Sequence, residues 1–154
     1  MAKNTNDPEE IDQEVRAWIY NESMQNGYPP SIAQVAGGLN LSVESVRTSF
    51  DRLAAGRVIV LQPESGEILM ANPFSAVPTP FLVEVDGLRC YGNCAWDVLG
   101  IPAMLKKDAR IISSCGDCAS TYELQVVNGR IMGDAGVLHF AVPVKQWWQD
   151  IVFT

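Results

Sequence analysis

Hydrophobic residues recur at helical spacing near the start of the chain. Residues 9–24 carry apolar side chains on one helical face and acidic residues between them. The apolar positions are Ile11, Val15, Trp18 and Ile19. This pattern predicts an amphipathic helix, preceded by a loose polar tail over residues 1–8.

Capping residues mark two further helices. Ser31 is a suitable N-cap for a short helix that ends at Gly37-Gly38. Ser42 opens a second helix, for which Gly56 supplies the C-cap. Two short apolar runs follow on either side of a turn and predict a hairpin. These runs span residues 57–61 and 67–70. A helix, a helix-turn-helix and a hairpin in this order predict a winged-helix-like domain.

A proline-rich stretch separates this unit from the rest of the chain. Residues 71–80 contain three prolines, which predicts an extended linker. Phe74 within it is placed to attach the linker to a neighbouring surface. We therefore divide the chain into a winged-helix-like domain with its linker, residues 1–78, and a second domain, residues 79–154.

The second domain alternates short apolar runs with turns. Asp86-Gly87 and Asn128-Gly129 are turn-forming pairs, and a helix is predicted from Asn93 onward. The predicted strands span residues 81–85, 108–114, 120–127, 130–131, 137–142 and 150–153, and a brief helical turn spans residues 143–148. One helix on a small, mostly antiparallel sheet makes the fold class α+β.

Length and composition indicate a folded, globular chain. The 154 residues allow one domain or two small ones, and 47% of them are hydrophobic. No apolar run approaches the roughly 20 residues that cross a bilayer. The polar, acidic first ten residues do not resemble a signal peptide. We therefore expect a cytoplasmic protein without a membrane partner, whose four cysteines are thiols or metal ligands.

The net charge of −7 lies mostly in the N-terminal half. Residues 1–78 carry five Lys/Arg and ten Asp/Glu, whereas residues 79–154 carry six and eight. The helix after Ser42 would read DNA in a winged helix, but it balances its basic and acidic residues. These are Arg47, Arg52, Glu44 and Asp51. The balance favours a packing role over DNA reading, and no nucleic-acid partner is expected.

Cys94 and Asp97 form the first candidate chemical pair. With Asn93 as N-cap, Cys94 falls in the first helical turn, where amide donors and the helix dipole favour a thiolate. Cys94 and Asp97 then share one helical face, so a nucleophilic sulfur stands beside a proton carrier. The alternative is a buried cysteine that fills space, which is the commoner case for an isolated pair.

Cys115-Gly116-Asp117-Cys118 lies at a predicted turn between two strands. Such a knuckle is half of a typical zinc site, so Cys115 and Cys118 are candidate metal ligands that Cys90 and Cys94 could join. The spacing from Cys90 to Cys94 is one residue longer than usual in a zinc ribbon, and this site would consume Cys94. A redox dithiol and a purely structural role remain open.

Other residues are weaker candidates. His139 falls at the centre of a predicted strand, which favours a core histidine over a base. Trp147-Trp148 favours a core anchor over a lid. The sequence contains neither a glycine-rich phosphate loop nor a serine-hydrolase elbow.

Several motifs follow one another in order over residues 81–154. They are Tyr91-Gly92-Asn93-Cys94-Ala95-Trp96-Asp97, Leu99-Gly100-Ile101-Pro102-Ala103, Lys106-Lys107, the strand leading to Cys115, His139-Phe140-Ala141-Val142-Pro143 and Trp147-Trp148-Gln149-Asp150-Ile151-Val152-Phe153-Thr154. Together they resemble the organomercurial (alkylmercury) lyase family. The winged-helix-like unit also fits the architecture of that family, in which it packs on the catalytic core without reading DNA.

The resemblance implies protonolysis of a carbon–mercury bond. Cys94 would attack and hold mercury, and Asp97 would carry a proton to the departing carbon, leaving a hydrocarbon and protein-bound Hg(II). Soft thiolates select soft metals, which agrees with this chemistry. The implied partners are organomercurial small molecules, low-molecular-weight thiols and a mercuric reductase. No resident cofactor is implied, and Cys115 and Cys118 leave a structural zinc open.

The resemblance also implies a second catalytic cysteine just after a strand like residues 150–154. This sequence has no cysteine after Cys118. We therefore expect the catalytic domain to be shortened at its C-terminus, with replacement by another cysteine or loss of activity as alternatives. Two other functions stay open: a non-catalytic thiolate module that binds zinc or mercury, and a metal-responsive winged-helix regulator.

Overall fold

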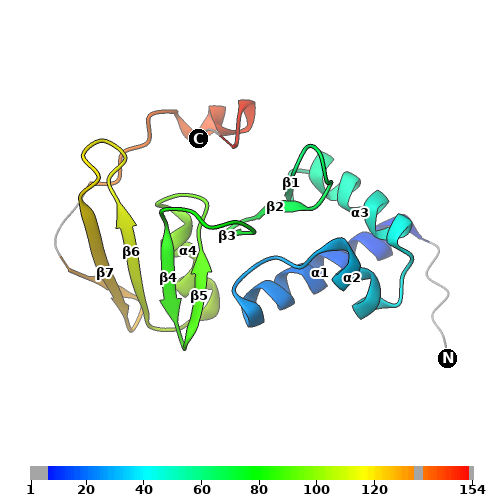
Figure 1. Cartoon of the computed structure of the whole chain (residues 1–154), viewed down its shortest axis with the longest axis horizontal. Coiled ribbons are helices and arrows are strands. Elements are labelled where there is room, and N and C mark those ends of the chain that lie inside the picture. The colour runs from blue at the N-terminus through cyan, green and yellow to red at the C-terminus, as the bar shows by residue number, and fades with distance from the viewer. Residues whose placement is uncertain (1–6, 134–136, 153–154) are drawn as a thin grey trace.

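Three helices open the chain in the computed structural model, which describes residues 7–133 and 137–152 (Figure 1). These helices are α1 (Pro8–Asn26), α2 (Ile32–Leu39) and α3 (Val43–Ala55). A small antiparallel sheet follows them, formed by β1 (Val60–Leu61), β2 (Ile68–Ala71) and β3 (Phe74–Ser75). The predicted order of helices followed by a hairpin is therefore present.

Local capping signals explain where the helices begin. Ser31 forms a reciprocal capping box with Gln34, and the Ser42 hydroxyl accepts a hydrogen bond of 3.1 Å from the amide of Ser45. The predicted end of α2 at Gly37-Gly38 is wrong, because the helix continues to Leu39. A Cβ on Gly38 would lie 2.2 Å from Cζ2 of Trp18. The glycine therefore permits close packing of α2 on α1 and does not end the helix.

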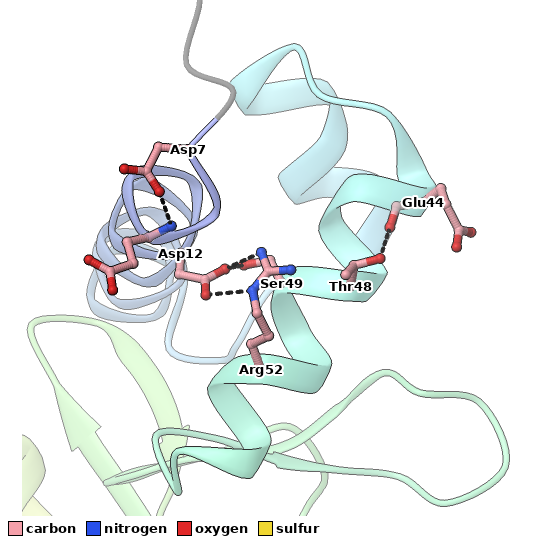
Figure 2. Close-up of polar contacts among 7 residues, drawn as sticks. Asp7, Asp12, Glu44, Thr48, Ser49 and Arg52 are labelled. Atoms are coloured by element: carbon pink, nitrogen blue, oxygen red, sulfur yellow. Dashed lines mark hydrogen bonds and ion pairs between the residues drawn. The ribbon is translucent and has the colours of Figure 1, made fainter.

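Asp12 joins α1 to α3 by polar contacts (Figure 2). Its carboxylate accepts hydrogen bonds from Ser49 at 2.6 Å and from two guanidinium nitrogens of Arg52 at 2.8 and 2.7 Å. Burial acts to raise the pKa of Asp12, but the bonds from Arg52 and Ser49 outweigh it and lower the pKa. Apolar residues of the three helices, of β2 and of the segment before β1 form the core of this unit. The fully or almost fully buried members are Val15, Ile19, Ile32, Val35, Ala36, Val46, Phe50, Leu53, Ile59, Ile68 and Ala71.

The second half of the chain forms a five-stranded antiparallel sheet with one helix against it (Figure 1). Its strands are β4 (Leu82–Val85), β5 (Leu88–Tyr91), β6 (Ala109–Ser114), β7 (Thr121–Val127) and β8 (Arg130–Met132), in the order β5-β4-β6-β7-β8. Helix α4 (Asp97–Leu105) follows β5 and buries Val98 and Ile101 against Val83 and Ile111. The predicted α+β class is confirmed.

Phe74 connects the two sheets. Residues predicted to be only an extended linker include β3, in which Phe74 pairs with Ala71 of β2. Phe74 also forms a single β-bridge with Gly92, directly after β5. Its side chain is completely buried in the cluster beneath the second sheet, to which Met24 of α1 also contributes. The expectation that Phe74 attaches this stretch to a neighbouring surface is thus confirmed.

The C-terminal segment differs from its prediction. Residues 137–142 form no strand. The last predicted strand, residues 150–153, is described over 150–152, and these residues form turns instead of a strand. Phe153 lies outside the described residues. The segment instead contacts itself: the Trp147 indole donates to the Val142 carbonyl at 2.9 Å, and the Phe140 and Trp147 rings lie 5.2 Å apart. Apolar alternation alone does not form a strand when no partner strand pairs with it. The predicted helical turn is confirmed as η1 (Val144–Gln149).

No helix within the described ranges is both long and apolar enough to cross a membrane.

Candidate active site

Cys94 lies in the turn that joins β5 to α4, before the helix begins. Its carbonyl accepts hydrogen bonds from the amides of Asp97 at 3.1 Å and Val98 at 3.3 Å. The prediction that Asn93 caps the helix and Cys94 occupies its first turn is wrong, because α4 starts at Asp97 with Trp96 in the N-cap position. The turn nevertheless places Cys94 and Asp97 side by side, so that each influences the pKa of the other.

Asp97 receives several hydrogen bonds at the start of α4. Asn93 donates to Oδ2 of Asp97 twice, from its backbone amide at 3.2 Å and from its side-chain Nδ2 at 3.1 Å. Interaction with the backbone and the thiol of Cys94 also lowers the pKa of this carboxyl. Burial raises the pKa of Asp97, and the bonds from Asn93 and the interaction with Cys94 offset the rise only in part. Asp97 is therefore easier to protonate than an ordinary aspartate.

Cys94 is half-buried and rests as a thiol. Burial raises its pKa above the ordinary value of 9.0, and the Asp97 carboxylate raises it further. The backbone amides of Asp97 and Trp96 act to lower this pKa. The expectation of a stabilised thiolate is nevertheless wrong, because the cost of burying the charged sulfur outweighs these amides. The arrangement therefore places a thiol beside a carboxylate.

Asn72, in the turn between β2 and β3, extends the site to the first sheet. Its Oδ1 accepts a hydrogen bond of 2.9 Å from Nδ2 of Asn93, the same nitrogen that donates to Asp97. Oδ1 of Asn93 is buried and has no hydrogen-bond partner among the described residues. Sequence reasoning missed Asn72 and assigned Asn93 only to capping, because the contact between them spans 21 residues.

Gly92 allows the close approach on which this turn depends. A Cβ on Gly92 would lie 3.1 Å from the amide nitrogen of Val98 and 3.2 Å from Cβ of Asp97. A side chain at this position would therefore press against the first turn of α4. Trp96, by contrast, is 61% exposed and leaves an aromatic surface next to Cys94 and Asp97.

The other three cysteines are placed differently. Cys90 is completely buried on β5, and burial raises its pKa to about 11. Cys115 is half-buried and Cys118 is exposed in the turn between β6 and β7. Hydrogen bonds with Ser120 and then with Cys115 lower the pKa of Cys118.

A four-thiolate zinc site is not formed. Within the described parts of the chain, no three His, Cys, Asp or Glu side chains are grouped so that they could hold a metal ion. All four cysteines lie in those parts. The suggested completion of the Cys115–Cys118 pair by Cys90 and Cys94 is therefore wrong.

Residues 74–154 match the sequence profile of the alkylmercury lyase family. The chain belongs to this family. The matched segment begins at Phe74 and includes Cys94 and Asp97, whereas Asn72 lies just before it.

Individual alkylmercury lyases are similar over a longer stretch. The enzyme of Bacillus cereus is 28% identical over 123 residues, covering 75% of this chain and 56% of the relative. That of Pseudomonas putida is 31% identical over 110 residues, covering 61% of this chain and 51% of the relative. The chain thus spans about half the length of these family members.

A solved structure supports the fold. The crystal structure of the mercury-bound form of MerB2 matches with a TM-score of 0.62 at 22% identity, covering 83% of this chain and 61% of that one. At this identity the match shows the shared fold of the alkylmercury lyase relatives.

His139 is exposed and not in a strand, which corrects its assignment to a strand centre. Trp148 stacks with the guanidinium of Arg57, which lies 5.4 Å from its ring centre. A cavity of about 500 Å³ opens at the far end of α4. It is lined by Leu99, Pro102, Ala103, Lys106, Lys107, Asp108, Val126, Asn128, Gly129 and Ile131, and so by neither Cys94 nor Asp97.

Proposed function

We propose that this chain performs the protonolysis of carbon–mercury bonds, with Cys94 as the mercury-binding nucleophile and Asp97 as the proton carrier. The observation that carries the proposal is the placement of Cys94 beside Asp97 in the turn before α4, where the Asp97 amide donates to the Cys94 carbonyl at 3.1 Å and burial raises the pKa of the Asp97 carboxyl. Membership of the alkylmercury lyase family supports the choice of substrate class.

In the first step Cys94 binds the mercury of an organomercurial thiolate, R–Hg–SR′. A sulfur–mercury bond forms, the thiolate R′S⁻ leaves, and the thiol proton passes to Asp97. Neutral Asp97 is favoured by the same burial that raises its pKa. A soft thiolate is the appropriate ligand for so soft a metal.

In the second step Asp97 returns this proton to carbon. The carbon–mercury bond breaks, its electron pair takes the proton, and the hydrocarbon RH leaves. R′S⁻ then completes the coordination of mercury as Cys94–S–Hg–SR′. Overall, R–Hg–SR′ and the Cys94 thiol give RH and the mixed thiolate of Hg(II).

A small thiol supplies the second sulfur in this scheme. No third Cys, His, Asp or Glu joins Cys94 and Asp97 in a metal-holding group within residues 7–133 and 137–152. The proposed partners are accordingly organomercurial small molecules, low-molecular-weight thiols and a mercuric reductase that accepts the product, in the cytoplasm.

The test is hydrocarbon release from an organomercurial in the presence of excess small thiol, measured by gas chromatography. Cys94→Ala should abolish release, and Asp97→Asn should lower the rate by roughly 100-fold or more. Asp51→Asn is the matched control, since it neutralises an exposed acid of α3 outside the site and should leave the rate unchanged. Wild-type turnover in Cys94→Ala would overturn the assignment.

Mercury binding without turnover is the second candidate. This alternative is favoured because Cys94 lies beside a carboxylate and not beside a second thiol. In that case the wild-type protein would bind methylmercury, Cys94→Ala would not, and no hydrocarbon would appear at any thiol concentration. The same gas-chromatographic assay separates the two functions.

We also propose that residues 8–75 form a winged-helix-like unit with a packing role. Its order of three helices followed by a hairpin supports this. Both arginines of α3 bond within the chain, Arg52 to Asp12 and Arg47 to the carbonyl of Ser65. These bonds favour the packing role over a metal-responsive regulator, which would require α3 to bind DNA in a gel-shift assay at low salt.

A further inference from the structure

Cys115 and Cys118 lie together at the tip of the β6–β7 hairpin. The loop is closed by two backbone hydrogen bonds of 2.9 Å, from the Cys115 amide to the Ser120 carbonyl and from the Ala119 amide to the Cys115 carbonyl. Strand pairing continues directly below, where Ser114 faces Thr121. The loop is therefore held in one conformation from both sides, and the two cysteines share its end.

The hairpin tip brings the two thiols within reach of one another. Sγ of Cys118 lies 3.1 Å from the hydroxyl oxygen of Ser120, and interaction with Cys115 adds to the lowering of the pKa of Cys118. Cys118 is exposed and Cys115 is half-buried, so an ion can reach the pair from solvent. Two adjacent, accessible thiols on a closed loop form a bidentate soft ligand.

The number of protein ligands available at Cys115 and Cys118 indicates which metal ion the pair can bind. A structural zinc site needs four protein ligands. In the described part of the chain no third Cys, His, Asp or Glu is grouped with this pair. A soft ion that is satisfied by two sulfur atoms, above all Hg(II), suits two thiols without further ligands.

We propose that Cys115 and Cys118 form a second Hg(II) site, separate from Cys94. Binding occurs by exchange from a small-thiol complex: Hg(SR′)₂ and the two cysteine thiols give Cys115–S–Hg–S–Cys118 and two R′SH. Two sulfur–mercury bonds break and two form, the two cysteine protons pass to the released thiols, and no redox change occurs.

The sheet register relates this site to Cys94. Leu82 of β4 pairs with Tyr91 of β5 on one side and with Ile112 of β6 on the other. The chain leaves the same edge of the sheet towards Cys94 after β5 and towards Cys115 after β6. If the lyase function proposed above holds, the pair receives product mercury at the edge where it is formed. Mercury binding by the pair does not depend on that function.

The experiment measures inorganic Hg(II) bound to the reduced full chain by native mass spectrometry, with excess glutathione as competitor. Cys94→Ala is the background, which removes the lyase site. We expect this variant to keep one Hg(II) per chain. In this background, Cys115→Ser and Cys118→Ser should each weaken the retention of Hg(II) against glutathione by roughly 100-fold, because a single remaining thiol forms only one sulfur–mercury bond. Ser114→Ala, on the strand beside the loop, is the matched control and should retain the ion.

The outcomes are distinguishable. Loss of Hg(II) in Cys94→Ala alone would overturn the second site, as would equal retention after both hairpin cysteines are replaced. Tight binding of Zn(II) alone to the pair, at one ion per chain, would overturn the assignment to a two-coordinate soft ion. Thermal unfolding of each variant checks that it is folded. Failure of hydrocarbon release in the wild-type protein would count against the lyase function and leave this result unaffected.

Discussion

Asn93 holds Asp97 through two hydrogen bonds to the same carboxylate oxygen, one from its backbone at 3.2 Å and one from its side chain at 3.1 Å. The side-chain nitrogen also donates to Asn72 at 2.9 Å. The proton affinity of Asp97 is therefore set by two opposing effects, burial that raises its pKa and donors that lower it. A residue outside the chemical pair thus adjusts the group proposed to carry the proton.

Replacing Asn93 by Ala should raise the pKa of Asp97 further. The substitution removes the Nδ2 donor and leaves the backbone donor in place, so the charged carboxylate loses one of its stabilising bonds. The ¹³C chemical shift of the Asp97 carboxyl, followed by NMR during a pH titration, measures this change. Asn72→Ala is the control, since it leaves both donors to Asp97. An unchanged midpoint in Asn93→Ala would show that the side-chain bond has no influence on the carboxyl.

Asp97→Asn should stabilise the protein at neutral pH, by about 1 kcal/mol. A group whose folded pKa is raised favours the folded state while it is protonated, and this contribution is lost as the pH rises through the folded pKa. Above that pH the wild-type protein buries a charge that asparagine does not carry. The gain should therefore disappear as the pH falls below the ordinary aspartate value of 3.8. Chemical denaturation at several pH values tests this, and a constant difference across the range would contradict it.

The sequence predicts the features of this fold that depend on residues close together in the chain, and it does not predict those that depend on contacts between distant segments. Ser31 and Ser42 cap helices as expected, because a cap involves residues two or three positions away. Cys94 and Asp97 are neighbours for the same reason. The contact of Asn72 with Asn93 is not readable from the sequence, because it depends on how β3 and β5 meet at Phe74 and Gly92. The raised pKa of Cys94 likewise depends on burial, which local spacing does not determine.

Gly92→Ala should lower the rate of hydrocarbon release by more than a loss of overall protein stability alone would explain. The added methyl group would lie 3.1 Å from the backbone nitrogen of Val98, so the first turn of α4 would have to move. Gly116→Ala is the matched control, because its Cβ would meet nothing within 4 Å. We expect Gly92→Ala to lower the rate of hydrocarbon release by roughly 100-fold, since small displacements of reacting groups cost that much. Equal rates in the two variants would show that the close approach is unimportant.

Asp12→Ala should destabilise the protein by about 1–2 kcal/mol, the range for charged hydrogen bonds reduced for partial exposure. It removes the acceptor for Ser49 and Arg52 and so the polar contact between α1 and α3. Because the folded pKa of Asp12 is lowered, its contribution is present above the ordinary value of 3.8 and is lost as the pH falls through the folded pKa. Asp51→Ala, an exposed acid on α3, is the control. Urea unfolding at neutral and acidic pH should show the difference between wild type and Asp12→Ala shrinking in acid.

Phe74→Ala should cost about 3–5 kcal/mol, the usual range for a buried aromatic residue replaced by alanine. Phe74 is completely buried, and its backbone pairs with Ala71 on one side and Gly92 on the other. The substitution therefore empties the core beneath α4 at the point where the two sheets are joined. Phe74→Leu keeps most of the apolar volume and should cost clearly less. Tyr28→Ala is the control for loss of an exposed aromatic residue, since Tyr28 is 51% exposed. Denaturant unfolding followed by tryptophan fluorescence measures all three, and a loss below 1 kcal/mol in Phe74→Ala would show that the junction does not depend on this side chain.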